Sequence, residues 1–218
     1  MEPFAAVADF RPAGAYVQWW KSRQDEKSAE TYWGTSTAPH RHNIIYALAA
    51  LLPKSVYEIG CASGPNLRKI REVDASIRLG GAEPCEPFAQ WAEQHLGMTV
   101  DRGSLPTFVP PPGWDVVLLC YVLAYLNPEE VALALSRLRN ETRPKALVFL
   151  EPEQPGEYGL LAERYTEDVC GPPVWFHDYW TLLPETGWAI QWRWPLLPPT
   201  HRLRNIYVVS PKEEPRNV

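Results

Sequence analysis

The chain has 218 residues, 45% of them hydrophobic, and a formal net charge of −5 at pH 7. The length fits one α/β domain, and the acidic balance disfavours a sequence-independent grip on nucleic acid, which needs phosphate-neutralising Lys and Arg side chains. No apolar run approaches the roughly 18–20 residues that span a bilayer, and the first ten residues lack the basic segment of a signal peptide, so we expect a cytoplasmic protein that does not enter the membrane.

The N-terminal part of the chain predicts helices. Residues 1–42 are rich in aromatic and polar side chains and are expected to form one or two short helices, interrupted near Pro39. Apolar residues then recur at helical spacing from Ile44 to Leu52, and Pro53 ends this helix.

Alternating strands and helices follow. Short apolar runs predict five strands, at residues 55–60, 76–83, 98–103, 114–126 and 145–153. Between them, helices are predicted at residues 64–73, 87–97 and 127–141. One more helix and two closing strands are expected at residues 176–187, 188–194 and 204–210. Such alternation indicates an α/β fold with a mostly parallel sheet, in which ligands bind beyond the carboxyl ends of the strands.

The stretch VYEIGCASGPNL, residues 56–67, joins the first strand to the helix after it. Gly60 and Gly64 lack side chains, so a ligand could approach the backbone closely here. The spacing is not the dinucleotide fingerprint G-x-G-x-x-G, because Ala62 and Pro65 stand where that pattern needs glycine. No Gly-Lys-Ser/Thr follows, which argues against a P-loop.

This stretch resembles motif I of the class I S-adenosylmethionine-dependent methyltransferases. Later segments follow the order of that family: an acid, Glu83, ends the second strand, the loop DRGSLPTF follows the third, and WDVVLLCYVLAYL corresponds to the fourth. The resemblance implies a Rossmann-like, doubly wound sheet of seven mostly parallel strands with one antiparallel strand and helices on both faces. It also implies an N-terminal helical lid (residues 1–42), a catalytic domain (43–212) and a short tail (213–218).

The resemblance further implies S-adenosylmethionine as the cofactor, S-adenosylhomocysteine as the product and no metal. Glu83 is placed to accept hydrogen bonds from the ribose hydroxyls. The contact with the adenine is left open between Ser104 and Asp101. Mapped onto this sequence, the cofactor-binding residues are Arg41, Glu58, Gly60, Cys61, Gly64, Asn66, Glu83, Pro84, Gly103, Ser104, Cys120 and Tyr121. The family usually has glycine where Ala62 stands, and we expect the added methyl group to be tolerated.

Candidates for chemistry lie around the expected site. His40, Glu151 and His177 are candidate bases or substrate contacts, against the alternatives of a solvated loop residue for His40 and a helix start beside His177. Substrate contacts are expected from Tyr32, Trp33, Tyr125 and Tyr179, although such aromatic residues also serve as packing. Methyl transfer depends mainly on positioning and desolvation, and a base is needed only where the acceptor must lose a proton.

The four cysteines, Cys61, Cys85, Cys120 and Cys170, are widely separated, and none has the spacing of a zinc site. We expect these cysteines to be reduced and to serve as packing residues.

The sequence as a whole favours a methyltransferase acting on an O or N nucleophile of a small molecule. Two alternatives stay open: an RNA or protein acceptor, and a non-catalytic partner subunit with the same fold. A nicotinamide oxidoreductase is disfavoured by the glycine spacing.

Overall fold

The computed structural model describes residues 25–152, 159–160, 175–195 and 204–213, together with Gln18 and Lys21. The helices are α2 (Glu26–Gly34), α3 (Pro39–Leu51), α4 (Pro65–Val73), α5 (Glu86–Leu96), α6 (Pro128–Arg137) and α7 (Tyr179–Glu185). The strands are β1 (Ser55–Ile59), β2 (Arg78–Ala82), β3 (Val100–Asp101), β4 (Val116–Cys120), β5 (Ala146–Pro152), β6 (Gly159–Leu160), β7 (Trp175–Phe176), β8 (Trp188–Pro195) and β9 (Arg204–Pro211).

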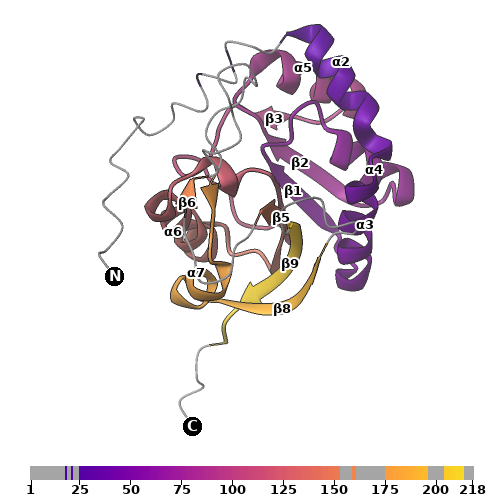
Figure 1. Cartoon of the computed structure of the whole chain (residues 1–218). Helices are drawn as coiled ribbons and strands as arrows, with labels where there is room; N and C mark the ends of the chain where they lie inside the picture. The colour runs from indigo at the N-terminus through magenta and orange to yellow at the C-terminus, as the bar shows by residue number, and fades with distance from the viewer. Residues whose placement is uncertain are drawn as a thin grey trace.

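The main sheet has seven strands in the order β3-β2-β1-β4-β5-β9-β8 (Figure 1). β1 to β5 pair in parallel, whereas β9 runs antiparallel to both β5 and β8. The predicted doubly wound sheet with one antiparallel strand is therefore confirmed. The chain order reverses between β1 and β4, and this switch point is where ligands bind in open α/β sheets.

Helices cover both faces of the sheet, as predicted (Figure 1). Alternate side chains of each central strand point to opposite faces. In β4, Val117 and Leu119 pack with the apolar residues of α6 and α7, whereas Leu118 packs with those of α3, α4 and α5. Every residue of β1 and β5 is buried, which is the pattern of strands covered on both sides.

The apolar segment after β4 differs from the prediction. A single strand was expected over residues 114–126, but the strand ends at Cys120, and Leu123–Tyr125 form a 3₁₀ turn, η2. Tyr121 has a left-handed backbone with φ +56°, which ends the strand. Residues 122–124 are buried in this turn, and a run of apolar residues does not distinguish a buried turn from a buried strand.

The region around residue 176 also differs. A helix was expected from residue 176, but Trp175–Phe176 form β7, which pairs with β6 in a small separate sheet, and α7 begins only at Tyr179. The Asp178 carboxylate accepts a hydrogen bond from the Trp180 N–H at 3.1 Å and so marks the start of the helix.

Part of the predicted lid segment is described. Helix α2 and the turn η1 (Thr35–Thr37) precede α3, which begins at Pro39 and so crosses the expected boundary between residues 42 and 43. Most of residues 1–24, and the expected tail beyond Glu213, lie outside the described residues.

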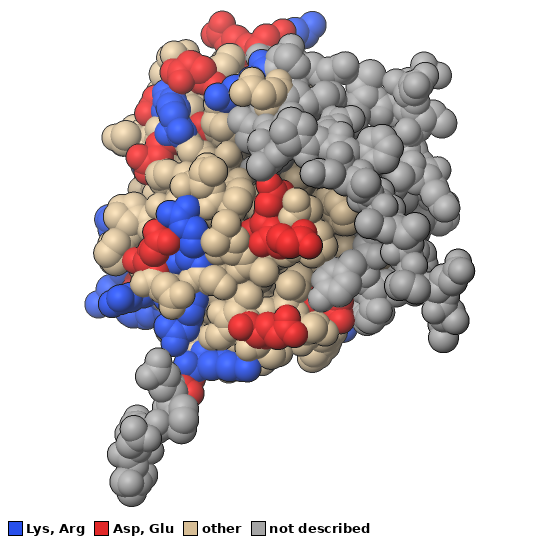
Figure 2. All heavy atoms as spheres, turned by 90° about the vertical axis from the view of Figure 1, so that its left-hand side faces the viewer, with Lys and Arg blue, Asp and Glu red and all other residues tan. Residues whose placement is uncertain are grey.

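The described surface carries both signs of charge. Figure 2 shows acidic and basic side chains interspersed over the described part of one face. Among the described helices, none combines the length and the apolar character that crossing a membrane requires.

Candidate functional site

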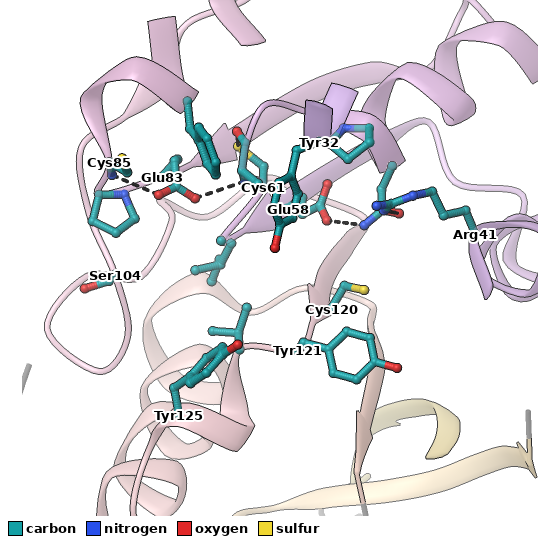
Figure 3. Close-up of a pocket in the computed structure, with 18 residues that line it drawn as sticks. Tyr32, Arg41, Glu58, Cys61, Glu83, Cys85, Ser104, Cys120, Tyr121 and Tyr125 are labelled. Carbon is teal, nitrogen blue, oxygen red and sulfur yellow. Dashed lines mark hydrogen bonds between the residues drawn. The ribbon is translucent and has the colours of Figure 1, made fainter. Parts of the chain in front are cut away.

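A cavity of about 250 Å³ opens at the carboxyl ends of β1, β2 and β4 (Figure 3). Glu83 and Ser104 lie at one end of it and Arg41 at the other, with Glu58 between them and Tyr125 on the opposite wall. The sequence-predicted residues that line the cavity are Tyr32, Arg41, Glu58, Gly60, Cys61, Asn66, Glu83, Pro84, Ser104, Cys120, Tyr121 and Tyr125. The sheet topology thus brings residues from six separate segments to one place.

The loop from Gly60 to Gly64 forms part of the cavity wall. Gly60, Ala62 and Gly64 all have left-handed backbones, with φ values of +70°, +49° and +86°. A methyl group added at Gly60 would lie 2.6 Å from Val122 Cγ2, and one at Gly64 would lie 2.8 Å from Leu96 Cδ1. Glycine is therefore favoured at both ends of the loop by the left-handed backbone, and the close approach of Val122 adds a spatial reason at Gly60. Gly64 itself does not line the cavity and is the N-cap residue that precedes α4.

A polar chain runs from Glu58 through Asn66 to Arg41. The Asn66 Nδ2 donates to Glu58 Oε1 at 2.5 Å, and Arg41 Nη1 donates to Asn66 Oδ1. Arg41 also donates to the carbonyl and hydroxyl of Thr35, at 2.8 and 2.7 Å, which ties the N-terminal segment to the cavity. The second carboxyl oxygen of Glu58 is buried and has no hydrogen-bond partner among the described residues.

The environment of Glu58 favours its neutral form. Burial raises its pKa to about 8, and the neighbouring Glu83 adds to this rise, whereas Asn66 and Arg41 act in the opposite direction. A cationic ligand group placed against the unpartnered oxygen would stabilise the ionised carboxylate.

Glu83 is held by backbone groups. Its carboxylate accepts from the Ala62 N–H at 3.0 Å and from the Cys85 N–H at 2.8 Å. Burial raises its pKa to about 7 against the effect of these two bonds. Each carboxylate oxygen can accept more than one hydrogen bond, so Glu83 keeps acceptor capacity on the side that faces the cavity.

Of the two candidates for the adenine contact in the loop after β3, Ser104 and Asp101, one lies at the cavity. Ser104 lines it, whereas Asp101 does not and accepts a hydrogen bond from the Tyr57 hydroxyl at 2.5 Å. Gly103 packs against the Phe108 ring, outside the cavity.

Three cysteines, Cys61, Cys85 and Cys120, line the same cavity. Burial raises the pKa of each thiol, in Cys120 to about 12. Cys170 lies outside the described residues.

Tyrosine rings line two sides of the cavity. Tyr32 of α2 lies with its ring centre 5.3 Å from that of Phe88, and Tyr121 and Tyr125 come from the turn after β4. Trp33 points elsewhere: Arg68 lies 4.9 Å from its ring centre, and His95 lies 5.2 Å from it. Trp33 therefore serves as packing between α2 and the helices beside it.

None of the candidate bases lines the cavity. Glu151 is fully buried and accepts three backbone N–H groups of residues 122–124. His177 is fully buried and bonds to the Leu123 carbonyl. The His40 ring lies nearly perpendicular to that of Tyr121, at 84°, with 6.3 Å between the ring centres.

Tyr179, an expected substrate contact, lies in the hydrophobic core. It is fully buried, and its ring centre lies 5.1 Å from that of Phe149 and 5.5 Å from that of Tyr207. This position makes Tyr179 a packing residue.

The sequence interpretation missed six cavity residues: Ile59, Ala62, Pro65, Cys85, Phe88 and Val122. Ala62 and Pro65 lie within the predicted loop and could have been included by position alone. Phe88 was placed in a predicted helix, and nothing in the sequence indicates that its side chain points back toward the strand ends. Among the described residues, no group of three or more His, Cys, Asp or Glu side chains could hold a metal ion.

No protein-family model matches this sequence, and comparison with curated proteins finds no match. The fold, by contrast, is similar to solved methyltransferases. The 1,6-didemethyltoxoflavin-N1-methyltransferase of Burkholderia thailandensis, solved with S-adenosylhomocysteine, has a TM-score of 0.69 at 15% identity, over 94% of this chain and 93% of that one. The magnesium protoporphyrin IX methyltransferase of Synechocystis PCC 6803, also solved with S-adenosylhomocysteine, has a TM-score of 0.63 at 16% identity, over 81% of this chain and 84% of that one.

The methyltransferase domain of the bacterial protein CtHen1 gives a TM-score of 0.62 at 14% identity, over 82% of this chain and 100% of that domain. Over most of its length, the chain therefore has the fold of the class I S-adenosylmethionine-dependent methyltransferases. The fold that the resemblance implied is confirmed.

Proposed function

We propose that the protein is an S-adenosylmethionine-dependent methyltransferase that transfers a methyl group to an O or N nucleophile of a small molecule. The observation that carries this proposal is the pair of buried carboxyl groups, Glu58 and Glu83, at the ends of adjacent strands and on one cavity. The solved neighbours that contain S-adenosylhomocysteine support the choice of cofactor.

The residues present fit this cofactor. The unpartnered oxygen of Glu58 suits the ammonium of the methionine part, and Arg41, at the end of the cavity beyond Glu58, suits its carboxylate. Glu83 suits the ribose hydroxyls, and Ser104 lies at the end of the cavity that would take the adenine. Gly60, which lines the cavity, presents its backbone to the ligand without a Cβ atom.

The chain contributes position and desolvation to the reaction. The cofactor, when bound, supplies an electrophilic methyl group on a sulfonium. Glu58 and Glu83 fix the two polar ends of the ligand, and the apolar Val122 and the rings of Tyr32 and Phe88 exclude water from the space between them. Tyr121 and Tyr125 stand on the wall opposite Glu58 and would orient the acceptor.

A small acceptor is supported by the cavity and by the neighbours. Arg41 is the one cationic side chain among the described residues that line the cavity, which gives little attraction for a polyanion. Two of the neighbours are named for small acceptors, 1,6-didemethyltoxoflavin and magnesium protoporphyrin IX.

Calorimetric titration with S-adenosylhomocysteine tests the proposal. The protein is expected to bind it, and Glu83→Ala is expected to weaken binding by about 10- to 100-fold, because a charged hydrogen-bond acceptor is lost. Glu129→Ala, at an exposed acid on α6, is the matched control and should bind as the unaltered protein does. Absence of binding by the unaltered protein would contradict the proposal.

The alternatives are separated by turnover. Formation of S-adenosylhomocysteine from S-adenosylmethionine is measured with panels of small hydroxy and amino compounds, and in parallel with RNA and with protein extract. Turnover with the small compounds supports the proposed acceptor class. Turnover with RNA or protein alone would favour a macromolecular acceptor, and binding without any turnover would favour a non-catalytic partner subunit.

A further inference from the structure

Two of the candidate bases contact the same short segment instead of the cavity. The Glu151 carboxylate accepts from the Val122 N–H at 2.7 Å, the Leu123 N–H at 3.0 Å and the Ala124 N–H at 3.2 Å. The carbonyl of Leu150, the residue before it, accepts from the Tyr121 N–H at 3.0 Å. The end of β5 therefore binds four successive N–H groups of the turn after β4.

Successive N–H groups that point to one side form an anion-binding concavity, and here a side chain of the protein itself fills it. This arrangement stabilises an unfavourable backbone. Tyr121 has φ +56°, and a left-handed conformation of this kind costs a non-glycine residue about 1–2 kcal/mol. Contacts from outside the turn must therefore hold it in place.

His177 holds the turn from a second side. Its Nε2 lies 3.1 Å from the Leu123 carbonyl oxygen, and because a carbonyl only accepts, Nε2 carries the proton and donates. Burial lowers the pKa of His177 to about 4, so the ring is neutral at neutral pH. The backbone of Leu126, like that of Leu123, acts against this fall in the pKa, so the His177 ring interacts with the backbone of both residues.

The turn carries much of one cavity wall. Tyr121, Val122 and Tyr125 all line the cavity. Val122 also packs so closely on the loop from Gly60 to Gly64 that a methyl group at Gly60 would lie 2.6 Å from the Val122 Cγ2. A shift of the turn would therefore move the wall opposite Glu58 and also disturb Gly60.

We infer that Glu151 is a positioning residue, which, together with His177, fixes residues 121–125 in the one conformation that closes the cavity against the Gly60 loop. It acts through the backbone and not as a base. This inference rests on the proposed function, because it concerns the site where S-adenosylmethionine would bind.

Glu151→Gln tests the inference, with Glu129→Gln as the matched control. The substituted amide keeps the shape but turns a donor toward one of the N–H groups. Amide exchange at Val122, Leu123 and Ala124, followed by NMR, is expected to become at least about tenfold faster, while the amides of α5 stay unchanged. Affinity for S-adenosylhomocysteine, measured by calorimetry on the folded variant, is expected to fall about tenfold.

Three results would overturn the inference. Unchanged affinity with unchanged exchange would show that Glu151 does not hold the turn. Faster exchange with unchanged affinity would limit Glu151 to stability. If Glu151→Gln does not fold, His177→Phe removes the donor to Leu123 and keeps a ring in its place, and unchanged affinity there would also contradict the inference.

The two proposals fail in distinguishable ways. Absence of S-adenosylhomocysteine binding by the unaltered protein contradicts the proposed function before any substitution is made. The exchange rates of residues 122–124 do not depend on a ligand and still report whether Glu151 holds the turn.

Discussion

Ala62 shows how a single residue can carry the loop geometry without glycine. Its φ of +49° is left-handed, and its N–H donates to Glu83 at 3.0 Å. The loop thus keeps the backbone that glycine would adopt freely, and the alanine bears a conformational cost of about 1–2 kcal/mol.

Ala62→Gly is therefore expected to stabilise the protein by about 0.5–1 kcal/mol, because relief of the left-handed strain exceeds the added entropy of the unfolded chain. Urea denaturation measures the change in the free energy of unfolding. Ala132→Gly, inside the right-handed helix α6, is the control and should destabilise by about 1 kcal/mol. Destabilisation by both substitutions would show that Ala62 is unstrained.

The sequence predicts that three acids lie at strand ends, but it does not predict which way their side chains point. Glu58, Glu83 and Glu151 each close a buried strand and look alike in sequence. Glu58 and Glu83 line the cavity, whereas Glu151 turns to the backbone of residues 122–124. Position at a strand end was predictable, but the direction of the side chain depends on a turn that lies far away along the chain.

At the level of elements, the end of β4 likewise depends on distant contacts. The apolar run was visible in the sequence, and the existence of β4 was predicted from it. The end of the strand at Cys120 was not predicted, because contacts from Leu150 and Glu151, nearly thirty residues further on, hold the turn with its left-handed Tyr121. Boundaries set by tertiary contacts carry no local signal.

The start of α6 is, by contrast, encoded locally, by the capping residue Asn127 and by Glu130 three residues later. The Asn127 side chain accepts from the Glu130 N–H at 2.8 Å, and the Glu130 carboxylate accepts from the Asn127 N–H at 3.0 Å. This reciprocal pair satisfies two N–H groups that the helix itself cannot.

Asn127→Ala is expected to lower the free energy of unfolding by about 1 kcal/mol, because one cap acceptor is lost. Urea denaturation gives the value, and Asn140→Ala, an exposed asparagine beyond the end of α6, serves as the control. Equal effects of the two substitutions would rule out a specific contribution of the cap.

At the scale of the whole molecule, the domain encloses three carboxyl groups with raised pKa values. Burial raises the pKa of Glu58 to about 8 and those of Glu83 and Glu151 to about 7. The folded protein therefore holds protons that the unfolded chain, with ordinary carboxyl pKa values, releases at lower pH. The stability linked to these groups is fully present at low pH and is lost as the pH rises through the folded values.

The ligand-free protein is accordingly expected to lose stability between pH 6.5 and pH 8, by up to about 1.4 kcal/mol per pH unit for each carboxyl group that titrates. His177, with its pKa lowered from 6.5 to about 4, acts in the opposite direction mainly below pH 6.5, and this effect fades across the lower part of the window. Urea denaturation at several pH values measures the slope. Glu58→Gln should make it shallower and Glu129→Gln should not, and a stability that rises with pH over this range would contradict the prediction.

The three thiols in the cavity wall determine how readily the site is oxidised. Peroxide attacks the thiolate and not the thiol. With a pKa of about 12 for Cys120, a fraction on the order of 10⁻⁵ is ionised at pH 7, and burial raises the pKa values of Cys61 and Cys85 as well. A pocket that looks vulnerable to oxidation by its composition is in this way protected, and its ability to bind a ligand is expected to survive exposure to peroxide.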